Sequence, residues 1–343
     1  MNLRSKNAIY TALLLIAMFV VWKVRQGNQT PLVTFSGRTM GPIVYTVKYF
    51  DQEGRNFQTE VDSLLKDFNQ SLNTYIPDSE ISTFNRDSSF SFSLPYFYPV
   101  LAASQKIYNL SSGAYDPTIM PLVSTWGFGP EKNINMDSSI VDSLKNLIGF
   151  EKIKFNEKRV DKLDSRVTLD FSASAKGYGV DVVNGFLKSK GITNALVEIG
   201  GEVVSSGVNL ENDKPWAVGI LNPNSDELNQ FYIAIVDISD RAMATSGNYF
   251  NYHIVDGVKY SHTISPFSGY PIIHSLLSAS VFADNCMEAD ALATAFMVLG
   301  YEKAIEILEQ HPEYDAYLVL SDDKGNLSTY ATEGIKPFLT DVQ

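Results

Sequence analysis

The chain has 343 residues, a net charge of −12, one cysteine and four histidines. This length suits one large domain or two ordinary ones, and the apolar content is that of a globular protein. The negative charge argues against a general nucleic-acid binder, which needs a basic face. The single cysteine excludes an intrachain disulfide and a cysteine-based zinc site, and the histidines are too scattered to suggest a multi-histidine metal centre.

The chain begins with an uncharged apolar run over residues 8–22, with basic residues on both sides. A full membrane span usually needs about 20 apolar residues, so this run is slightly short, and it also suits the core of a signal peptide. Because no small-x-small cleavage site follows, we expect an uncleaved membrane anchor, with a cleaved signal as the alternative. The expected plan is a tail over 1–7, the anchor over 8–22, a linker over 23–33 and a single domain over 34–340.

Beyond the linker, the spacing of apolar residues predicts strands and helices. We expect strands over 33–35, 43–47, 166–169, 195–199, 202–204, 216–221, 231–238, 274–283, 314–321 and 327–331. We expect helices over 57–72, 95–110, 139–147, 180–187 and 285–310, the last broken at Gly300. Strands joined by hairpins, with helices between them, indicate an α+β fold with largely antiparallel or mixed sheets and packed helices.

The segment from Asp170 to Asp181 places small residues between an expected strand and an expected helix. Bare backbone N–H groups and a helix dipole at such a junction favour an anion, and Lys176 adds a positive charge. An ordinary strand-to-helix turn explains the segment equally well, so the segment alone does not decide between the two.

A carboxylate and a hydroxyl lie one helical turn apart at Asp290 and Thr294. Such hard oxygen ligands suit Mg²⁺, which leaves positions for water and phosphate oxygens. Judged by spacing alone, the more frequent explanation is that Asp290 interacts with the dipole of its helix and that Thr294 packs in the core. His262 stands between small hydroxylated residues before a Pro-Phe-Ser-Gly turn, where it is either a general base or a structural histidine.

Two further segments are candidates for loops of a functional site. Residues 244–249 read as a small polar loop after a strand, which suits phosphate, a peptide or simply a turn. Residues 113–118 are followed by a run rich in glycine and aromatic residues. A rigid surface loop closed by aromatic packing is the plainer interpretation of that second segment.

Each signal is weak alone, but their order and wording together resemble one family, the FAD:protein FMN transferases of the ApbE type. The resemblance runs from about residue 39 to residue 300 and so covers nearly all of the chain beyond the anchor. It rests on ordered blocks at residues 39–41, 79–82 with 84–85, 113–118, 175–178, 198–202, 245–249, 260–262 and 289–294. The fold that it implies is a single ApbE-like, T-fold-like α+β domain.

The resemblance implies a transferase that cleaves the pyrophosphate of FAD, attaches FMN through a phosphoester to a threonine or serine of another protein, and releases AMP. Its substrate would be FAD and its cofactor Mg²⁺. The implied metal ligands are Asp290, Thr294 and the main-chain oxygen of Ala173, and His262 is implied to help the incoming hydroxyl lose its proton. The implied flavin-nucleotide contacts are Met40, Tyr75, Ala114, Tyr115, Asp116, Asp170, Lys176 and Ile264.

On this interpretation the anchor lies in the bacterial inner membrane, and the catalytic domain, residues 34–340, lies on the periplasmic, extracytoplasmic side. The expected partners are FAD, the membrane and acceptor redox proteins that carry the modified Thr or Ser, with no nucleic acid. Two alternatives use the same residues. One is an Mg²⁺-dependent FAD pyrophosphatase, in which water replaces the protein hydroxyl, and the other is a non-catalytic, membrane-tethered FAD-binding protein.

Overall fold

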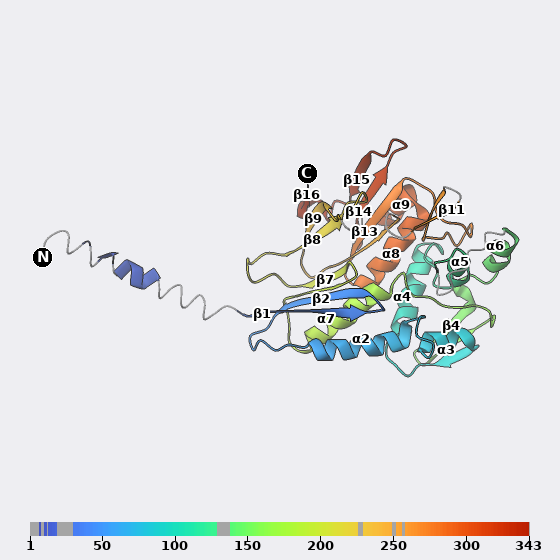
Figure 1. Cartoon of the computed structure of the whole chain (residues 1–343), viewed down its shortest axis with the longest axis horizontal. Helices are drawn as coiled ribbons and strands as arrows, with labels where there is room; N and C mark the ends of the chain where they lie inside the picture. The colour runs from blue at the N-terminus through green and yellow to red at the C-terminus, as the bar shows by residue number, and fades with distance from the viewer. Residues whose placement is uncertain are drawn as a thin grey trace.

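The computed structural model describes residues 30–128, 138–225, 229–248, 252–255 and 258–342, together with short stretches between residues 7 and 18 (Figure 1). Residues 13–18 are helical. In the described part of the chain, no helix combines the length and the apolar character that a membrane crossing requires. Most of the predicted tail, anchor and linker lies outside the described residues.

An eight-stranded antiparallel sheet forms the centre of the described domain (Figure 1). In spatial order its strands are β1 (Leu32–Thr39), β2 (Ile43–Phe50), β6 (Ala195–Ile199), β7 (Glu202–Ser206), β10 (Ala242–Gly247), β13 (Leu276–Ala283), β14 (Asp315–Ser321) and β15 (Leu327–Ala331). Successive side chains of a strand point to opposite faces, so Tyr45, Val47 and Tyr49 of β2 are buried on one face while Lys48 lies on the other. Gly200 and Gly201 both have positive φ and form the tight β6–β7 turn.

Helices cover one face of this sheet and share its largest hydrophobic core. They are α2 (Gln58–Leu72), α7 (Ala175–Ser189), α8 (Cys286–Leu299) and α9 (Tyr301–Gln310). Asn285 caps α8 by accepting from the backbone N–H of Glu288 at 2.9 Å. Asp181 of α7 accepts from the N–H groups of Cys286 and Met287, both at 2.8 Å. Because these bonds satisfy the first amides of α8, they fix the start of α8 against α7.

A smaller antiparallel sheet packs on the opposite face. It consists of β8 (Trp216–Leu221), β9 (Tyr232–Ile238) and β16 (Leu339–Asp341), with β9 in the middle. Trp216 is buried and its ring lies 5.9 Å from that of Phe50 in β2. The same core includes Val203 of β7 and Phe282 of β13, so the small sheet covers the middle strands of the large one.

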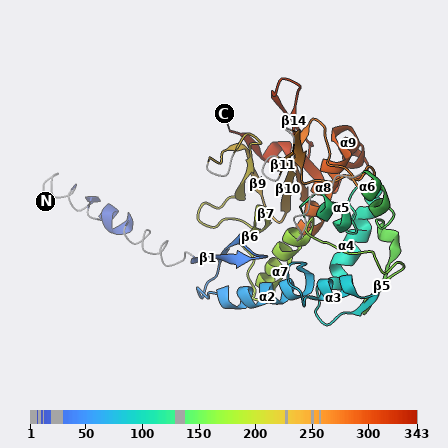
Figure 2. The ribbon, with the colours of Figure 1, turned by 45° about the vertical axis from the view of Figure 1, so that its right-hand side comes forward.

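The remaining described elements lie mainly beside α7 and α8 (Figure 2). They are α3 (Glu80–Arg86), β3 (Ser89–Ser91), α4 (Phe97–Leu110), α5 (Met120–Thr125), α6 (Ser138–Lys145), β4 (Ile153–Phe155), β5 (Arg159–Lys162), the hairpin strands β11 (Tyr252–Val255) and β12 (Val258–Ser261), and short 3₁₀ turns at Phe150–Lys152 and Lys336–Phe338. A second core joins α2, α3 and α4 to β4, β5 and the start of α7 through aromatic side chains such as Phe68, Phe97 and Tyr178.

The predicted α+β class with antiparallel sheets is confirmed, but three local predictions are wrong. Residues 166–169 form no strand in the described structure, because the side chain of Asn85 bonds both the N–H and the C=O of Leu169, at 2.7 and 2.8 Å. Helix α7 begins at Ala175 rather than at residue 180. Residues 245–247 belong to β10 rather than to a loop, because they pair with residues 278–280 of β13.

Candidate active site

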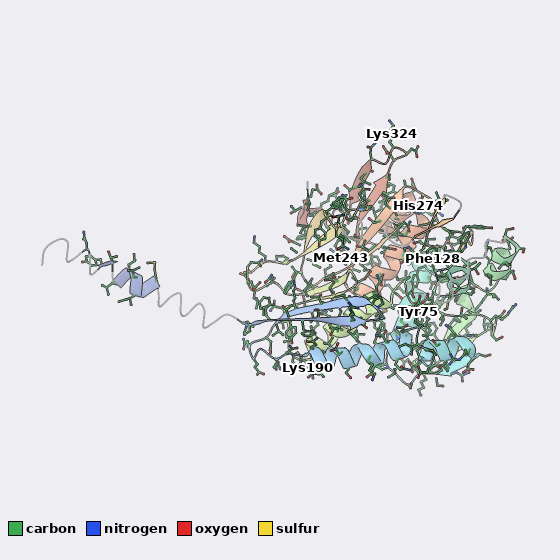
Figure 3. The ribbon with its side chains drawn as sticks, viewed as in Figure 1. Tyr75, Phe128, Lys190, Met243, His274 and Lys324 are labelled. Atoms are coloured by element: carbon green, nitrogen blue, oxygen red, sulfur yellow. The ribbon has the colours of Figure 1, made fainter. Side chains whose placement is uncertain are left out.

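A cavity of about 1250 Å³ is bordered by the start of α7, by α8, by the β6–β7 turn and by β10. Every predicted site residue except Met40 lines it, namely Tyr75, Ala114, Tyr115, Asp116, Asp170, Ala173, Lys176, His262, Ile264, Asp290 and Thr294. Met40 lines an adjoining cavity of about 340 Å³, and Tyr75 and Lys176 line both. Figure 3 labels three residues that line the larger cavity from distant parts of the chain: Tyr75 after α2, Phe128 after α5 and Met243 in β10.

The segment that leads into α7 is shaped by its own backbone. The N–H of Asp170 donates to the carbonyl of Pro117 at 2.8 Å, and the carbonyl of Phe171 accepts from Ser174 and Ala175 at 2.8 and 2.7 Å. The Asp170 carboxylate accepts from the N–H and hydroxyl of Ser172, at 3.0 and 2.6 Å. Burial raises the pKa of Asp170 even though these bonds favour its charged form. The predicted small-residue turn before a helix is therefore present, and Asp170, Ser172, Ala173 and Lys176 of this segment line the cavity.

Helices α7 and α8 meet at Gly177 and Asp290. The N–H of Gly177 donates to Oδ2 of Asp290 at 3.0 Å, so an amide from the first turn of α7 is satisfied by a side chain of α8. Asp290 is buried, and this burial raises its pKa to about 6, although the nearby Lys176 opposes the shift. Thr294 follows one turn along α8 and also lines the cavity.

Hard oxygen donors are available at this point. Asp290 offers a carboxylate, Thr294 a hydroxyl and Ala173 a main-chain carbonyl, which is the donor chemistry that Mg²⁺ prefers. Over the residues that the structure describes, no group of three or more His, Cys, Asp or Glu side chains is arranged to hold a metal ion. The predicted metal ligands include only one carboxylate, beside a hydroxyl and a main-chain carbonyl, so they differ from a cluster of three such side chains. Its chemistry fits Mg²⁺, and its role stays a prediction.

Lys176 forms an ion pair that the sequence analysis did not foresee. Its Nζ lies 2.5 Å from Oε1 of Glu202, which follows the β6–β7 turn. Glu202 is 1% exposed, and its other oxygen, Oε2, is a buried atom without a hydrogen-bond partner among the described residues. Burial raises the pKa of Glu202 to about 8, against the effect of Lys176. Burial opposes the charge of Lys176, but the carboxylates of Glu202 and Asp290 raise its pKa above the ordinary value.

The residues 114–116 form the wall of the cavity next to α4. The hydroxyl of Tyr115 is bonded to those of Ser174 and Ser104, at 2.9 and 3.1 Å, which ties this loop to the start of α7 and to α4. Oδ1 of Asp116 accepts from the N–H and the hydroxyl of Thr118, at 2.8 and 2.6 Å. Burial raises the pKa of Asp116 to about 6. The plainer interpretation, a surface loop, is wrong here, because residues 114–116 are buried and line the cavity.

His262 directly follows strand β12 and lines the cavity. Its ring is partly buried and lies 6.3 Å from that of Phe128, edge to face. Ile264 is buried in a small core with Leu122 and Trp126. The predicted turn after His262 is present, since the N–H of Gly269 donates to the carbonyl of Ser265 at 2.8 Å.

Two predicted contacts remain, Tyr75 and Met40. Tyr75 is 64% exposed, so most of its ring is open to a ligand. Met40 has a φ of +50°, a left-handed backbone that is uncommon for a residue with a side chain. Its side chain packs against Gly179 of α7, where the Cε of Met40 would lie 3.1 Å from an added Cβ.

Sequence reasoning missed several residues of the cavity. Glu202 stood in the recognised block at 198–202, but nothing in the local pattern paired it with Lys176. Thr245 and Ser246 also line the cavity, and the hydroxyl of Thr245 lies 2.7 Å from that of Ser280. The block at 245–249 signalled these two, although the predicted loop is a strand.

Comparison with known protein families identifies the family of this chain. The ApbE family model matches residues 40–318. The chain belongs to the ApbE family. The predicted family is thereby confirmed, and with it the prediction of an enzyme that transfers flavin. The roles of individual residues stay predictions.

Relatives of this ApbE chain match it over most of its length. An FAD:protein FMN transferase of Vibrio cholerae is 38% identical over 317 residues, which cover 90% of this chain and 93% of the relative. One of Haemophilus influenzae is 34% identical, with 87% and 89% covered. Among solved structures, the flavin transferase ApbE from Vibrio cholerae has a TM-score of 0.80 at 36% identity, and covers 90% of this chain and 100% of that one. The Pseudomonas stutzeri flavinyl transferase ApbE in its apo form has a TM-score of 0.78 at 33% identity, with 89% and 96% covered.

Proposed function

We propose that this flavin transferase cleaves FAD between its two phosphates, joins FMN through a phosphoester to a Thr or Ser of an acceptor redox protein, and releases AMP. The observation that carries the proposal is the single cavity lined by Lys176, His262, Asp290 and Thr294. These residues come from α7, from the segment after β12 and from α8. The phosphates of FAD, a metal ion and a proton acceptor would therefore meet in the same cavity.

The start of α7 is the proposed seat of the phosphates. The dipole of α7 favours an anion at the start of the helix, and Lys176 adds a positive charge. Glu202 holds Lys176 by its ion pair, which fixes the position of the ammonium group and offsets part of its charge. The exposed ring of Tyr75, Met40, the loop 114–116, Asp170 and Ile264 would hold the rest of FAD.

The proposed metal ligands are the Asp290 carboxylate, the Thr294 hydroxyl and the Ala173 carbonyl. Bound Mg²⁺ would neutralise phosphate charge and orient the phosphates. The position of Asp290 supports this assignment, because its buried carboxylate lines the cavity together with Ala173 and with Thr294, which follows one helical turn later. A cation at this point would compensate the charge of the buried carboxylate.

The proposed chemical step is attack of the acceptor hydroxyl on the phosphorus of the FMN half of FAD. The new bond joins the hydroxyl oxygen to that phosphorus, the bond from phosphorus to the bridging oxygen breaks, and AMP leaves with that oxygen. His262 takes the proton of the hydroxyl, as an imidazole in reach of the reacting oxygen can do near neutral pH. Attack by water at the same phosphorus would give FMN and AMP, which is the pyrophosphatase alternative.

One incubation tests the proposal. The purified enzyme is mixed with FAD, Mg²⁺ and a candidate acceptor redox protein, and the acceptor is examined for covalent flavin by in-gel fluorescence. Fluorescence on the acceptor with release of AMP is expected. Release of free FMN and AMP without a labelled acceptor would contradict transfer and show that the enzyme hydrolyses FAD. Unchanged FAD would show that the protein only binds it. His262→Ala is expected to lower transfer about 10²–10⁴-fold, the usual contribution of general acid–base catalysis, with unchanged affinity for FAD.

The location of the enzyme is also a proposal. The apolar run over residues 8–22 supports an anchor in the bacterial inner membrane, with the catalytic domain on the periplasmic side. Protease treatment of intact spheroplasts tests this orientation. Digestion of the domain in intact spheroplasts is expected, and protection until lysis would place it on the cytoplasmic side.

A further inference from the structure

The cavity extends well beyond the residues assigned to FAD and the metal. From the β6–β7 turn its lining continues over Lys48 of β2, over Leu196 and Glu198 of β6, and along β8 at Ala217, Gly219 and Leu221. Its volume of about 1250 Å³ exceeds the range of about 300–1000 Å³ that is usual for a site of one small molecule. Transfer between two substrates requires such a continuous space, because the acceptor hydroxyl must reach a phosphorus that FAD holds inside the cavity.

Strand β8, which lines this extension, is also an edge strand of the smaller sheet. It pairs with β9 on one side, and among the described strands none pairs with its other side. Trp216 fixes β8 in place, because its ring packs 5.9 Å from Phe50 and its Nε1 donates to the carbonyl of Ser206 at 3.3 Å. Strand β8 is therefore fixed in place where it lines the same cavity as Lys48 of β2 and Glu198 of β6.

The composition of β8 is unusual for an edge. Proteins commonly protect edge strands with charged residues or proline, since the unpaired N–H and C=O groups are a template for another strand. The sequence of Trp216–Leu221 contains neither, and small residues, Ala217 and Gly219, line the cavity. Ala217 is exposed, and its short side chain leaves room for a second backbone to approach, whereas the ring of Tyr232 on β9 covers Gly219, where an added Cβ would lie 2.3 Å from it.

Resting on the proposed function, we propose that the edge of β8 binds the acceptor protein as an added strand. An extended acceptor segment pairs with β8 through its main chain, lies over Leu196, and leads its Thr or Ser towards Lys176 and His262. Binding by strand addition draws affinity from main-chain bonds and specificity from alternate side chains. Lys48 and Glu198 supply that specificity, since Lys48 lies opposite Leu196 in the β2–β6 register and Glu198, of opposite charge, lies two residues along β6 from Leu196. The partner segment is therefore polar and extended.

The test compares Ala217→Arg with Ile235→Arg. Ala217 is exposed and lines the cavity, whereas Ile235 is 36% exposed on the neighbouring strand β9 and does not line it. The two variants add the same charge and bulk to one sheet, and neither changes a residue placed in the FAD or metal site. The probe is a purified redox domain that the wild-type enzyme labels with FMN. In Ala217→Arg the KM for this domain is expected to rise at least about tenfold, the equivalent of about 1.4 kcal/mol, with an unchanged Kd for FAD. Ile235→Arg is expected to match the wild type.

A second measurement does not depend on turnover. The same domain, with its acceptor Thr or Ser replaced by Ala, is added to wild-type enzyme with FAD, and hydrogen exchange is followed. Slower exchange at residues 217–221 is expected, because pairing protects the edge amides of β8.

The outcomes that overturn the proposal differ from one another. An equal KM in both variants, or no added protection of β8, would place the acceptor elsewhere. A weaker affinity for FAD in Ala217→Arg would assign this part of the cavity to the nucleotide. A wild-type dimer that Ala217→Arg dissociates would make a second copy of the chain the occupant. If the wild-type enzyme releases FMN and AMP but labels no acceptor domain, the proposed function itself fails, and the acceptor site fails with it.

Discussion

The backbone N–H of Gly177 and the carboxylate of Asp290 are joined by a hydrogen bond of 3.0 Å between α7 and α8. A side chain at position 177 has no room. A Cβ there would lie 2.2 Å from the carbonyl oxygen of Cys286 and 2.9 Å from the Cβ of Asp290. The glycine thus lets the two helices approach closely enough for the proposed phosphate seat and the proposed metal ligands to share one cavity.

Gly177→Ala is therefore expected to push α7 away from α8. We expect the free energy of unfolding to fall by about 1–3 kcal/mol, the usual cost of overpacking a core, and the affinity for FAD to fall as well. Gly185→Ala is the matched control, because it lies on the same helix and a Cβ there meets nothing within 4 Å. That control should leave stability unchanged or raise it by up to about 1 kcal/mol. Urea unfolding of both variants makes the comparison, and equal effects would contradict it.

Local patterns predicted the parts of the site that lie within one element. Asp290 and Thr294 are four residues apart, so their shared helix face follows from helical geometry alone. The small-residue turn before α7 was visible for the same reason, because its features are neighbours in the chain. The prediction that His262 belongs to the site came from the resemblance to the family, because no local pattern distinguishes a functional lone histidine from a structural one.

Local sequence patterns did not predict the contacts between distant segments of the chain. The pair of Lys176 and Glu202 exists because the sheet carries the β6–β7 turn to the start of α7, and no local pattern encodes that meeting. Leu169 reads as part of a strand from its apolar neighbours, yet Asn85, far away in sequence, takes its backbone bonds. In both cases tertiary partners decide what local propensity leaves open.

Removal of the carboxylate at Asp290 tests the proposed metal site. Asp290→Asn keeps an oxygen that can accept from the N–H of Gly177 but loses the charge, whereas Asp290→Ala loses both. Both variants are expected to lower Mg²⁺-dependent cleavage of FAD by about a hundredfold or more, because metal catalysis contributes several kcal/mol. AMP release is measured against MgCl₂ concentration, with chelation by EDTA as the metal-free reference. Full activity of either variant would remove Asp290 from the metal site.

The ion pair of Lys176 and Glu202 predicts an energetic coupling. Lys176→Met leaves the buried Glu202 carboxylate without its partner, which we expect to cost about 3 kcal/mol of unfolding free energy at pH 9, near the lower end for a broken buried pair. Glu202→Gln removes the charge that Lys176 faces. The double variant should be more stable than the sum of the single effects predicts, since neither charge is then left alone. A double-mutant cycle by urea unfolding measures this, and strict additivity would show that the pair contributes no coupling.

Asp116 predicts a pH dependence of stability. Burial raises its pKa from 3.8 to about 6, so between about pH 4 and pH 6 the folded protein binds more protons at this group than the unfolded chain does. Stability contributed by this group is then present at low pH and is lost as the pH rises through this window.

Asp116→Asn abolishes this titration while keeping an oxygen that can accept from Thr118. The variant's unfolding free energy relative to the wild type should increase from pH 4 to pH 6.5, by at most about 3 kcal/mol. Asp142→Asn, at an exposed position of α6, is the control for loss of one negative charge and should show a smaller change. Urea unfolding at several pH values without FAD or Mg²⁺ gives both curves. If the Asp116→Asn curve runs parallel to that of the wild type, the Asp116 carboxyl does not titrate in this window.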